Sequence, residues 1–379
     1  MIEWSDDQRA LRESCSEWHN ALSADHIEHD RGSEFSRDKW QLIRDSGILR
    51  LPFDTRWGGL GKDLLTTMYV LESLGRGCRN GGLNFSVSTH IFSAGVPVHR
   101  FGSEELKGRY MRSICEGSSI GAHAITEPDA GSDAMSMSTT ASVDGGCFVL
   151  DGRKAFITNG PVANLFVVYA RTDRGRDFRG ITAFLVERGT EGFTVGPPVE
   201  KMGLRTSPFC ELTFDRCRVP KRNVLGRVGS GFFILEHVMA WEILCLFVIA
   251  VGEMEHRLER CLAHAKTRTQ FGQPIGSFGA VADKLVESKI GVETSRRWLY
   301  ETAERFTGRQ NVTMDLAIAK LLTSEANATS ALAAIQLFGG RGYVTENGFE
   351  QDLRNAVAGT IYSGTSEMQR RRIATMLGL

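Results

Sequence analysis

The stretch MAWEILCLFVIAVG at residues 239–252 constrains the fold of this chain more than any other feature of the sequence. It is an almost unbroken apolar run with a single carboxylate, Glu242, near its start. If the run is helical, the residues one turn away from Glu242 offer neither water nor a cation, since they are Val238, Met239, Cys245 and Leu246. We therefore expect a helix covered by protein on every side, in which burial raises the pKa of the carboxylate.

A buried carboxylate of this kind has two interpretations. Proton-abstracting active sites use carboxylates whose pKa is raised by burial, which makes Glu242 a candidate general base. Structural buried acids with a distant Arg or Lys partner also exist. The apolar stretch alone leaves both interpretations open.

Composition sets the broad class of protein. A chain of 379 residues is long enough for two or three domains, and 42% apolar residues can supply a substantial core. Basic and acidic residues number 45 each, so the net charge of zero gives no footprint for nucleic acid or an anionic membrane. We also expect no membrane insertion, because the apolar run is shorter than the roughly 20 residues that span a bilayer.

The N-terminus and the cysteines indicate a cellular setting. Acidic residues and a helical pattern stand where a signal peptide would need a basic start and an apolar stretch. Eight cysteines are scattered without a CxxC pair or a Cys/His cluster at metal spacing. We expect a reduced, cytoplasmic protein without a metal site, in which most thiols are small core residues.

The pattern of apolar residues divides the chain into three parts. Apolar residues recur at helical spacing over residues 1–119, and long helical stretches return over residues 227–379. Residues 120–226 show short β-branched runs separated by turn signals such as Asp151-Gly152, in which glycine accepts a positive φ. The sequence predicts a mainly α protein with a central β domain, between an N-terminal helical domain and a C-terminal antiparallel bundle.

Five short segments carry the remaining information. No phosphate-binding glycine motif of the Rossmann or P-loop kind stands between a strand and a helix, so any nucleotide is bound in another way. Each of the five, taken alone, is typical of a turn, a strand end or a helix cap. They are TEPDAGSD at 126–133, KAFITNG at 154–160, RTQFGQPI at 268–275, QLFGGRGY at 336–343 and IYSGTSEMQ at 361–369.

In this order and at these separations, the five segments resemble the acyl-CoA dehydrogenase family over nearly the whole chain. The resemblance implies a helical N-terminal domain, a middle β-barrel or sandwich domain and a C-terminal four-helix bundle. It further implies FAD, a homotetramer or dimer, and oxidation of an acyl thioester to its α,β-unsaturated form, with a hydride passing from Cβ to flavin N5. The electrons would then pass to an electron-transfer flavoprotein or to O2.

The resemblance, carried over position by position, assigns residues to the cofactor. The side chains expected beside the flavin ring and the pyrophosphate are Thr126, Ser132, Phe156 and Thr158. The positions expected to reach the FAD of a neighbouring subunit are Arg268, Gln270 and Phe271. The glycine loop expected to approach the dinucleotide is marked by Gln336, Gly339 and Gly340, and the contacts expected at the adenine half are Thr365 and Glu367.

The catalytic base departs from the usual pattern of the family. In most members a glutamate follows the Tyr of the last motif, but here that position is Ser363, whose hydroxyl is too weak a base. In the isovaleryl-CoA dehydrogenase branch the base lies on the long bundle helix, at the position of Glu242, although Ile243 follows it where that branch usually has Arg. The resemblance thus implies Glu242 as the base and the backbone N–H of Ser363 as the donor to the thioester oxygen. A carboxylate at position 363 would repel one at 242.

The substrate has several candidates. MAWE followed by CLF, together with SGTSEMQ, is most similar to the branch acting on aminoacyl groups tethered to carrier proteins, such as the prolyl-carrier-protein dehydrogenases of secondary metabolism. The nearest alternative is a short branched acyl-CoA such as isovaleryl-CoA. Oxygen-using flavin monooxygenases and oxidases share the fold, and a non-catalytic flavoprotein stays open if Glu242 is a structural acid.

Overall fold

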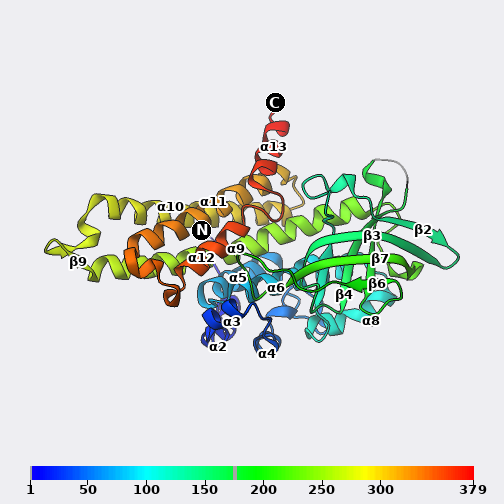
Figure 1. The fold of residues 1–379 in the computed structure, drawn as a ribbon, viewed down its shortest axis with the longest axis horizontal. Helices are drawn as coiled ribbons and strands as arrows, with labels where there is room; N and C mark the ends of the chain where they lie inside the picture. Colours follow the sequence, from blue (N-terminus) through cyan, green and yellow to red (C-terminus); the bar gives the residue numbers. More distant parts are fainter. Residues whose placement is uncertain (1, 174–176) are drawn as a thin grey trace.

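The computed structural model describes residues 2–173 and 177–379 of the chain. A sheet lies at one end of an elongated molecule and a helical bundle extends to the other end, with the N-terminal helices packed below the middle (Figure 1). The prediction of a mainly α protein with a central β domain is therefore confirmed.

The N-terminal part is built from short helices with side-chain caps. Ser5, Asp63 and Ser103 each accept a hydrogen bond from a backbone N–H of the first turn of the helix that follows. A π-helix, η3, continues α6 into α7 without a break. In chain order the elements are α1 (Asp6–Ser16), α2 (His19–Ser23), α3 (His26–Gly32), α4 (Arg37–Asp45), η1 (Ile48–Arg50), η2 (Thr55–Trp57), α5 (Leu64–Gly77), α6 (Gly81–Ser88), η3 (Thr89–Gly95), α7 (Val96–Phe101) and α8 (Glu104–Cys115).

The central part is one eight-stranded sheet in the order β6-β7-β3-β2-β4-β5-β8, with β1 pairing parallel to β4. Its strands are β1 (Gly121–Ala124), β2 (Thr140–Asp144), β3 (Cys147–Thr158), β4 (Leu165–Arg171), β5 (Ile181–Glu187), β6 (Phe193–Val195), β7 (Phe209–Pro220) and β8 (Val224–Leu225). Three short 3-10 helices interrupt the connections, namely η4 (Ala134–Ser136), η5 (Phe178–Gly180) and η6 (Lys221–Asn223).

One predicted turn is wrong. Asp151-Gly152 does not end a strand but lies inside β3, where the register against β7 shifts between Leu150 and Gly152. Gly152 has a φ of 147° and approaches Thr139 so closely that a Cβ would lie 2.6 Å from the threonine Oγ1. A β-bulge, like a tight turn, favours glycine because glycine adopts a positive φ without strain. The Asp151-Gly152 dipeptide therefore predicted a turn where the strand has a bulge.

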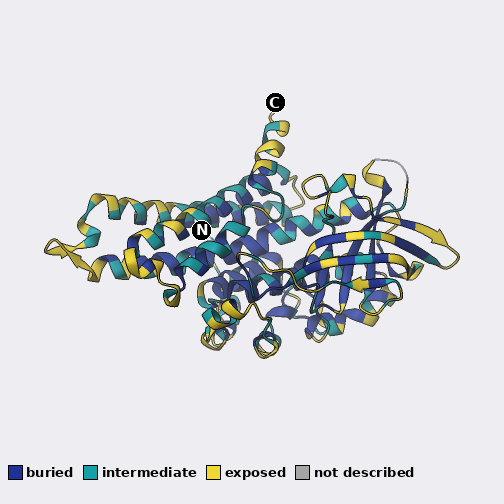
Figure 2. Cartoon of the chain, viewed as in Figure 1, coloured by how far each residue is buried: buried dark blue, intermediate teal, exposed yellow. Residues whose placement is uncertain are grey.

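The C-terminal part is a bundle centred on the long helix α9. The bundle helices are α9 (Gly231–Thr267), α10 (Gly279–Thr307), α11 (Thr313–Phe338), α12 (Phe349–Ala358) and α13 (Ser366–Met376). Between them lie β9 (Thr269–Gln270), β10 (Gln273–Pro274), η7 (Ile275–Ser277), η8 (Gly339–Tyr343) and η9 (Thr345–Asn347). Burial is concentrated where α9 passes the N-terminal helices, and exposure increases toward β9 (Figure 2).

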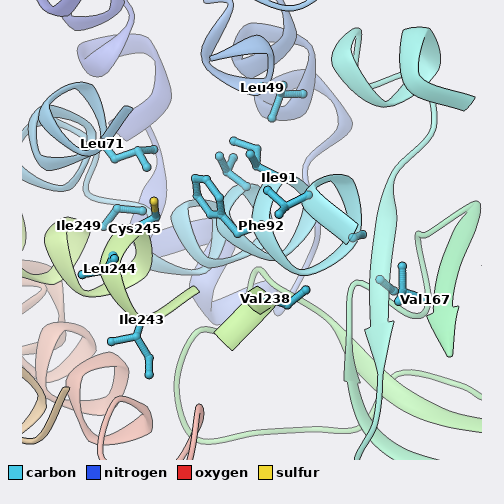
Figure 3. Packing of buried hydrophobic residues seen from close by; sticks show 14 of the residues in the cluster. Leu49, Leu71, Ile91, Phe92, Val167, Val238, Ile243, Leu244, Cys245 and Ile249 are labelled. Carbon is cyan, nitrogen blue, oxygen red and sulfur yellow. The ribbon is translucent and has the colours of Figure 1, made fainter. Parts of the chain in front are cut away.

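Helix α9 has 37 residues, and an 18-residue window in it has a mean hydropathy of 2.1. Length and composition alone would therefore let it cross a bilayer, contrary to the expectation based on the shorter run 239–252. However, 67% of that window is buried inside the protein, and core helices of soluble proteins pass the same test. Val238, Leu244 and Cys245 of α9 pack in one apolar cluster with Phe92 of η3 (Figure 3).

Helices α5 and α9 meet backbone to backbone at two glycines. A Cβ on Gly75 would lie 2.0 Å from the carbonyl oxygen of Ile249, and one on Gly252 would lie 2.1 Å from the carbonyl oxygen of Glu72. Only glycine leaves room for this approach. The two glycines therefore set how closely the N-terminal helices cover α9.

Gly252→Ala should separate α5 from α9 and lower the free energy of unfolding by about 1–3 kcal/mol, the usual cost of overpacking a core. Chemical denaturation of the purified variants measures this. Gly279→Ala at the start of α10 is the control, because nothing lies within 4 Å of the added Cβ. Its stability should stay within about 0.5 kcal/mol of the parent. Equal stability of the two variants would contradict the proposed close contact.

Candidate functional site

Glu242 on α9 is held through both oxygens of its carboxylate. The Oγ of Ser93 in η3 donates to Glu242 Oε2 at 2.6 Å, and the Oγ of Ser363 donates to Oε1. Burial raises the pKa of Glu242, and the hydrogen bonds from Ser363 and Ser93 oppose part of that rise. The fold thus brings together the two positions that the sequence singled out for the base, although they lie 121 residues apart.

The backbone at Ser363 adopts an unusual conformation. Its φ of 55° lies in the left-handed region that non-glycine residues rarely occupy. The Ser363 carbonyl accepts a hydrogen bond from Gln369 Nε2 at 3.1 Å, while its N–H has no acceptor within the part of the chain that the structure describes. A free N–H next to a half-buried carboxylate can serve as a hydrogen-bond donor to a substrate oxygen.

A second acid, Glu253, lies three turns further along α9 and was not singled out from the sequence. It borders a cavity of about 20 Å³ that is also lined by Asn84 and Tyr362. Burial raises its pKa to about 7. This cavity has the size of a single water, whereas Glu242 contacts the Ser363 loop.

The loop after β1 and the end of β3 lie side by side, because the N–H of Ala155 donates to the carbonyl of Thr126 at 2.9 Å. Next to this contact, the ring of Phe156 is 64% exposed and its backbone has a φ of 58°. The hydroxyls of Thr126, Ser132 and Thr158 have no hydrogen-bond partner among the described residues. Free hydroxyls beside an exposed aromatic face can hold a planar polar ring.

A buried ion pair joins the same two segments, and the sequence reasoning missed it. Lys154 Nζ lies 2.8 Å from Glu127 Oε1, and both side chains are almost fully buried. Glu127 also accepts hydrogen bonds from the backbone N–H of Ser138 at 2.6 Å and of Thr139 at 2.9 Å. Burial alone would raise the pKa of Glu127, but Lys154 and these donors lower it to about 2. The only signal in the sequence was an acid in TEPDAGSD and a lysine in KAFITNG.

The other predicted cofactor residues lie elsewhere. From Glu242 to Arg268, α9 rises roughly 39 Å at 1.5 Å per residue. Arg268 ends α9, and Gln270 and Phe271 follow it at the tip of the bundle opposite the sheet, where Phe271 is 94% exposed (Figure 1). Gln336, Gly339 and Gly340 belong to this end as well, because the neighbouring rings of His264 and Phe338 stack at 4.1 Å. One chain therefore presents two separate groups of predicted residues.

The last two predicted contacts flank the start of α13. The Thr365 hydroxyl caps this helix by accepting from the N–H of Met368 at 3.3 Å. Glu367 is exposed in the first turn. Both follow the Ser363 loop directly in the sequence, so the cap fixes where that loop ends.

Lys154→Met should leave the Glu127 carboxylate buried without its cation and cost about 3–5 kcal/mol of unfolding free energy at pH 7. Denaturant unfolding measures this. The control is Lys289→Met, whose ion pair with Glu293 is exposed and contributes about 0–1 kcal/mol. Because the folded pKa of Glu127 is lowered from 4.5 to about 2, its stabilisation should be lost as the pH falls through that interval. Equal losses in both variants would show that the buried pair contributes nothing specific.

Comparison with known proteins gives a family for this arrangement. Residues 5–118, 122–217 and 229–378 match the N-terminal, middle and C-terminal domains of acyl-CoA dehydrogenase. The chain is 39% identical to an L-prolyl-[peptidyl-carrier protein] dehydrogenase of a Serratia species over 344 residues, which are 91% of this chain and 89% of that protein. The solved structure of the prolyl acyl carrier protein oxidase AnaB covers 100% of both chains at 40% identity with a TM-score of 0.97. PigA with FAD and proline covers 100% of this chain and 99% of its own at 36% identity, also with a TM-score of 0.97. The chain belongs to the acyl-CoA dehydrogenase family.

Proposed function

We propose that this protein is an FAD-dependent dehydrogenase that oxidises the Cα–Cβ bond of a prolyl group held as a thioester on a carrier protein. The observation that carries the proposal is the half-buried carboxylate of Glu242, which both serines hold at the Ser363 loop. The 39% identity to a prolyl-carrier-protein dehydrogenase supports the choice of acyl group. The alternative carrier of the thioester is coenzyme A, and the bleaching experiment below distinguishes the two.

The residues at the sheet edge fit FAD. The unpartnered hydroxyls of Thr126, Ser132 and Thr158 would donate to flavin and pyrophosphate oxygens, and the exposed ring of Phe156 would lie against the flavin. The buried pair of Glu127 and Lys154 keeps the two segments that carry these side chains together. When bound, FAD supplies the acceptor for the hydride that leaves Cβ.

The chain itself would handle the proton and the developing charge. Glu242 would take the proton from Cα, and the free N–H of Ser363 would stabilise the charge that develops on the thioester oxygen. The apolar residues packed around the base, such as Ile243 and Leu244, limit the access of water to it. A raised pKa makes the carboxylate a stronger base, but activity should fall as the pH drops through that pKa.

The predicted cofactor residues at the end of the bundle opposite the sheet are assigned to a site shared with a second copy of the chain. Arg268, Gln270 and Phe271, with Gln336, Gly339 and Gly340, lie too far along α9 to share a cofactor with Glu242 of the same chain. We assign them to the FAD of a neighbouring subunit in a homotetramer or dimer, where a guanidinium suits a pyrophosphate. Thr365 and Glu367 would meet the adenine half of the cofactor.

The cysteines bear on the cellular compartment, and the similar solved structures bear on the electron acceptor. All eight cysteines are unpaired, which suits a reducing cytoplasm. The electrons would pass to an electron-transfer flavoprotein or to O2. The similarity to the prolyl acyl carrier protein oxidase AnaB supports O2 as a candidate acceptor.

Glu242→Gln should lower turnover by about 10²–10⁴-fold, the usual contribution of a general base, while FAD content stays unchanged. The flavin spectrum and the initial rate measure the two quantities. Glu253→Gln removes the other acid of α9 whose pKa is raised by burial and should leave turnover within a few fold of the parent. An active Glu242→Gln variant beside an inactive Glu253→Gln variant would transfer the role of base to Glu253.

The proposed substrate is tested by anaerobic bleaching of the flavin absorbance. The FAD-loaded protein is mixed in turn with a prolyl-loaded carrier protein, prolyl-CoA, isovaleryl-CoA and butyryl-CoA. We expect bleaching with the prolyl-loaded carrier protein and much slower bleaching with the CoA esters. Rapid bleaching by isovaleryl-CoA would make this a short branched-chain acyl-CoA dehydrogenase. Bleaching by none of the four would contradict the dehydrogenase proposal and favour an oxygen-using or non-catalytic flavoprotein.

A further inference from the structure

Ser93 contacts the carboxylate of Glu242 from a helix that the sequence motifs did not mark. Its Oγ donates to Glu242 Oε2 at 2.6 Å across 149 residues of sequence, and its side chain is 3% exposed. The other oxygen, Oε1, accepts from Ser363. Each carboxylate oxygen therefore has one hydroxyl donor, one from the N-terminal helical part and one from the C-terminal part of the chain.

The backbone around Ser93 keeps its side chain in this position. Ser93 lies in η3, a π-helix of seven residues from Thr89 to Gly95. Such segments interrupt α-helices frequently at functional sites, because their wider turn changes the direction of the side chains that follow. Ile91 and Phe92 of η3 are fully buried in the apolar cluster that surrounds α9 (Figure 3). Ser93 is thus held by a packed core segment.

No charge competes with the two serines. Within the part of the chain that the structure describes, no Lys, Arg, His, Asp or Glu side chain shifts the pKa of Glu242. The titratable groups packed around it are Tyr169 of β4, Tyr362 beside Ser363 and Cys245 one turn along α9, and burial raises the pKa of all three, so they stay neutral. His90 of η3 is neutral as well, because burial lowers its pKa to about 4.

We propose that Ser93 is a positioning residue that, together with Ser363, holds Glu242 by both carboxylate oxygens and favours its ionised form. The role in turnover rests on the proposed function, in which Glu242 is the base. Hydroxyl donors suit this task because they stabilise the carboxylate without adding a fixed positive charge that would weaken its basicity. When Glu242 has taken a proton, the same hydroxyls can rotate and accept a hydrogen bond from it.

Removing the Ser93 hydroxyl shifts the pKa of Glu242 in a known direction. A hydrogen bond to the charged form lowers the pKa of a carboxyl group, so removing the Ser93 hydroxyl raises the pKa of Glu242 further. Glu242 is then protonated up to a higher pH, and the acid limb of kcat/KM moves upward by about one pH unit. At a pH within that limb, kcat/KM falls about tenfold.

The experiment measures Glu242 directly in the FAD-loaded protein without substrate. The carboxylic acid band in the infrared spectrum is followed against pH, and it is assigned to Glu242 by its absence in Glu242→Gln. Ser93→Ala should move the midpoint upward by about one pH unit, and Ser93→Thr, which keeps the hydroxyl, should move it back. The matched control is Ser88→Ala, because Ser88 is 1% exposed and its Oγ has no partner among the described residues.

The outcomes separate this inference from the proposed substrate. A midpoint in Ser93→Ala equal to that of Ser88→Ala would overturn the role of Ser93, whatever the protein oxidises. A shifted midpoint in a protein that leaves all four thioesters untouched would support the serine contacts and contradict the proposed function instead. If Ser93→Ala does not fold, Ser93→Cys keeps nearly the same volume with a much weaker donor. The same infrared titration of that variant then decides.

Discussion

The placement of a half-buried carboxylate within the apolar run of α9 is the constraint on which the rest of this structure depends. An unpaired charge in such a place is costly, so the surrounding elements must supply polar contacts without admitting water. Two serines from distant parts of the chain supply them, and Gly75 and Gly252 let α5 close over the same helix. The close contact of α5 with α9 and the hydrogen bonds to Glu242 therefore both depend on how the N-terminal helices pack on α9.

Backbone strain gathers at the positions that the motifs single out. Nine non-glycine residues in the described ranges have a positive φ, and Phe156, Phe271 and Ser363 are three of them. Each such residue costs of order 1–3 kcal/mol and persists only where its surroundings hold it. Around Ser363 the amide of Gln369 from α13 does so, and at Phe156 the shifted register between β3 and β7 does so. Packing energy from regular elements therefore offsets the strain at Phe156 and Ser363.

Local pattern and long-range contact differ in how well the sequence reveals them. The helical and β textures predicted the fold class, and the run around Glu242 predicted a buried helix, because both depend on nearby residues. The partners of Glu242 could not be predicted in this way. Nothing in the spacing of STHIFSAG indicates that Ser93 meets a carboxylate 149 residues away. The pair of Lys154 and Glu127 was hidden for the same reason, since a lysine in a strand is normally read as a solvent-facing side chain.

The π-helix makes the position of Ser93 sensitive to the length of this segment. Ser93 faces Glu242 from within η3, so deleting one residue before it in this segment would turn its side chain by about 100° around the helix axis. In the sequence, Ser93 precedes all eight strands of the large sheet and Glu242 follows them. A recombination event anywhere between them would join a base to a foreign η3. A substitution at either position therefore acts on the other, although 149 residues of sequence separate them.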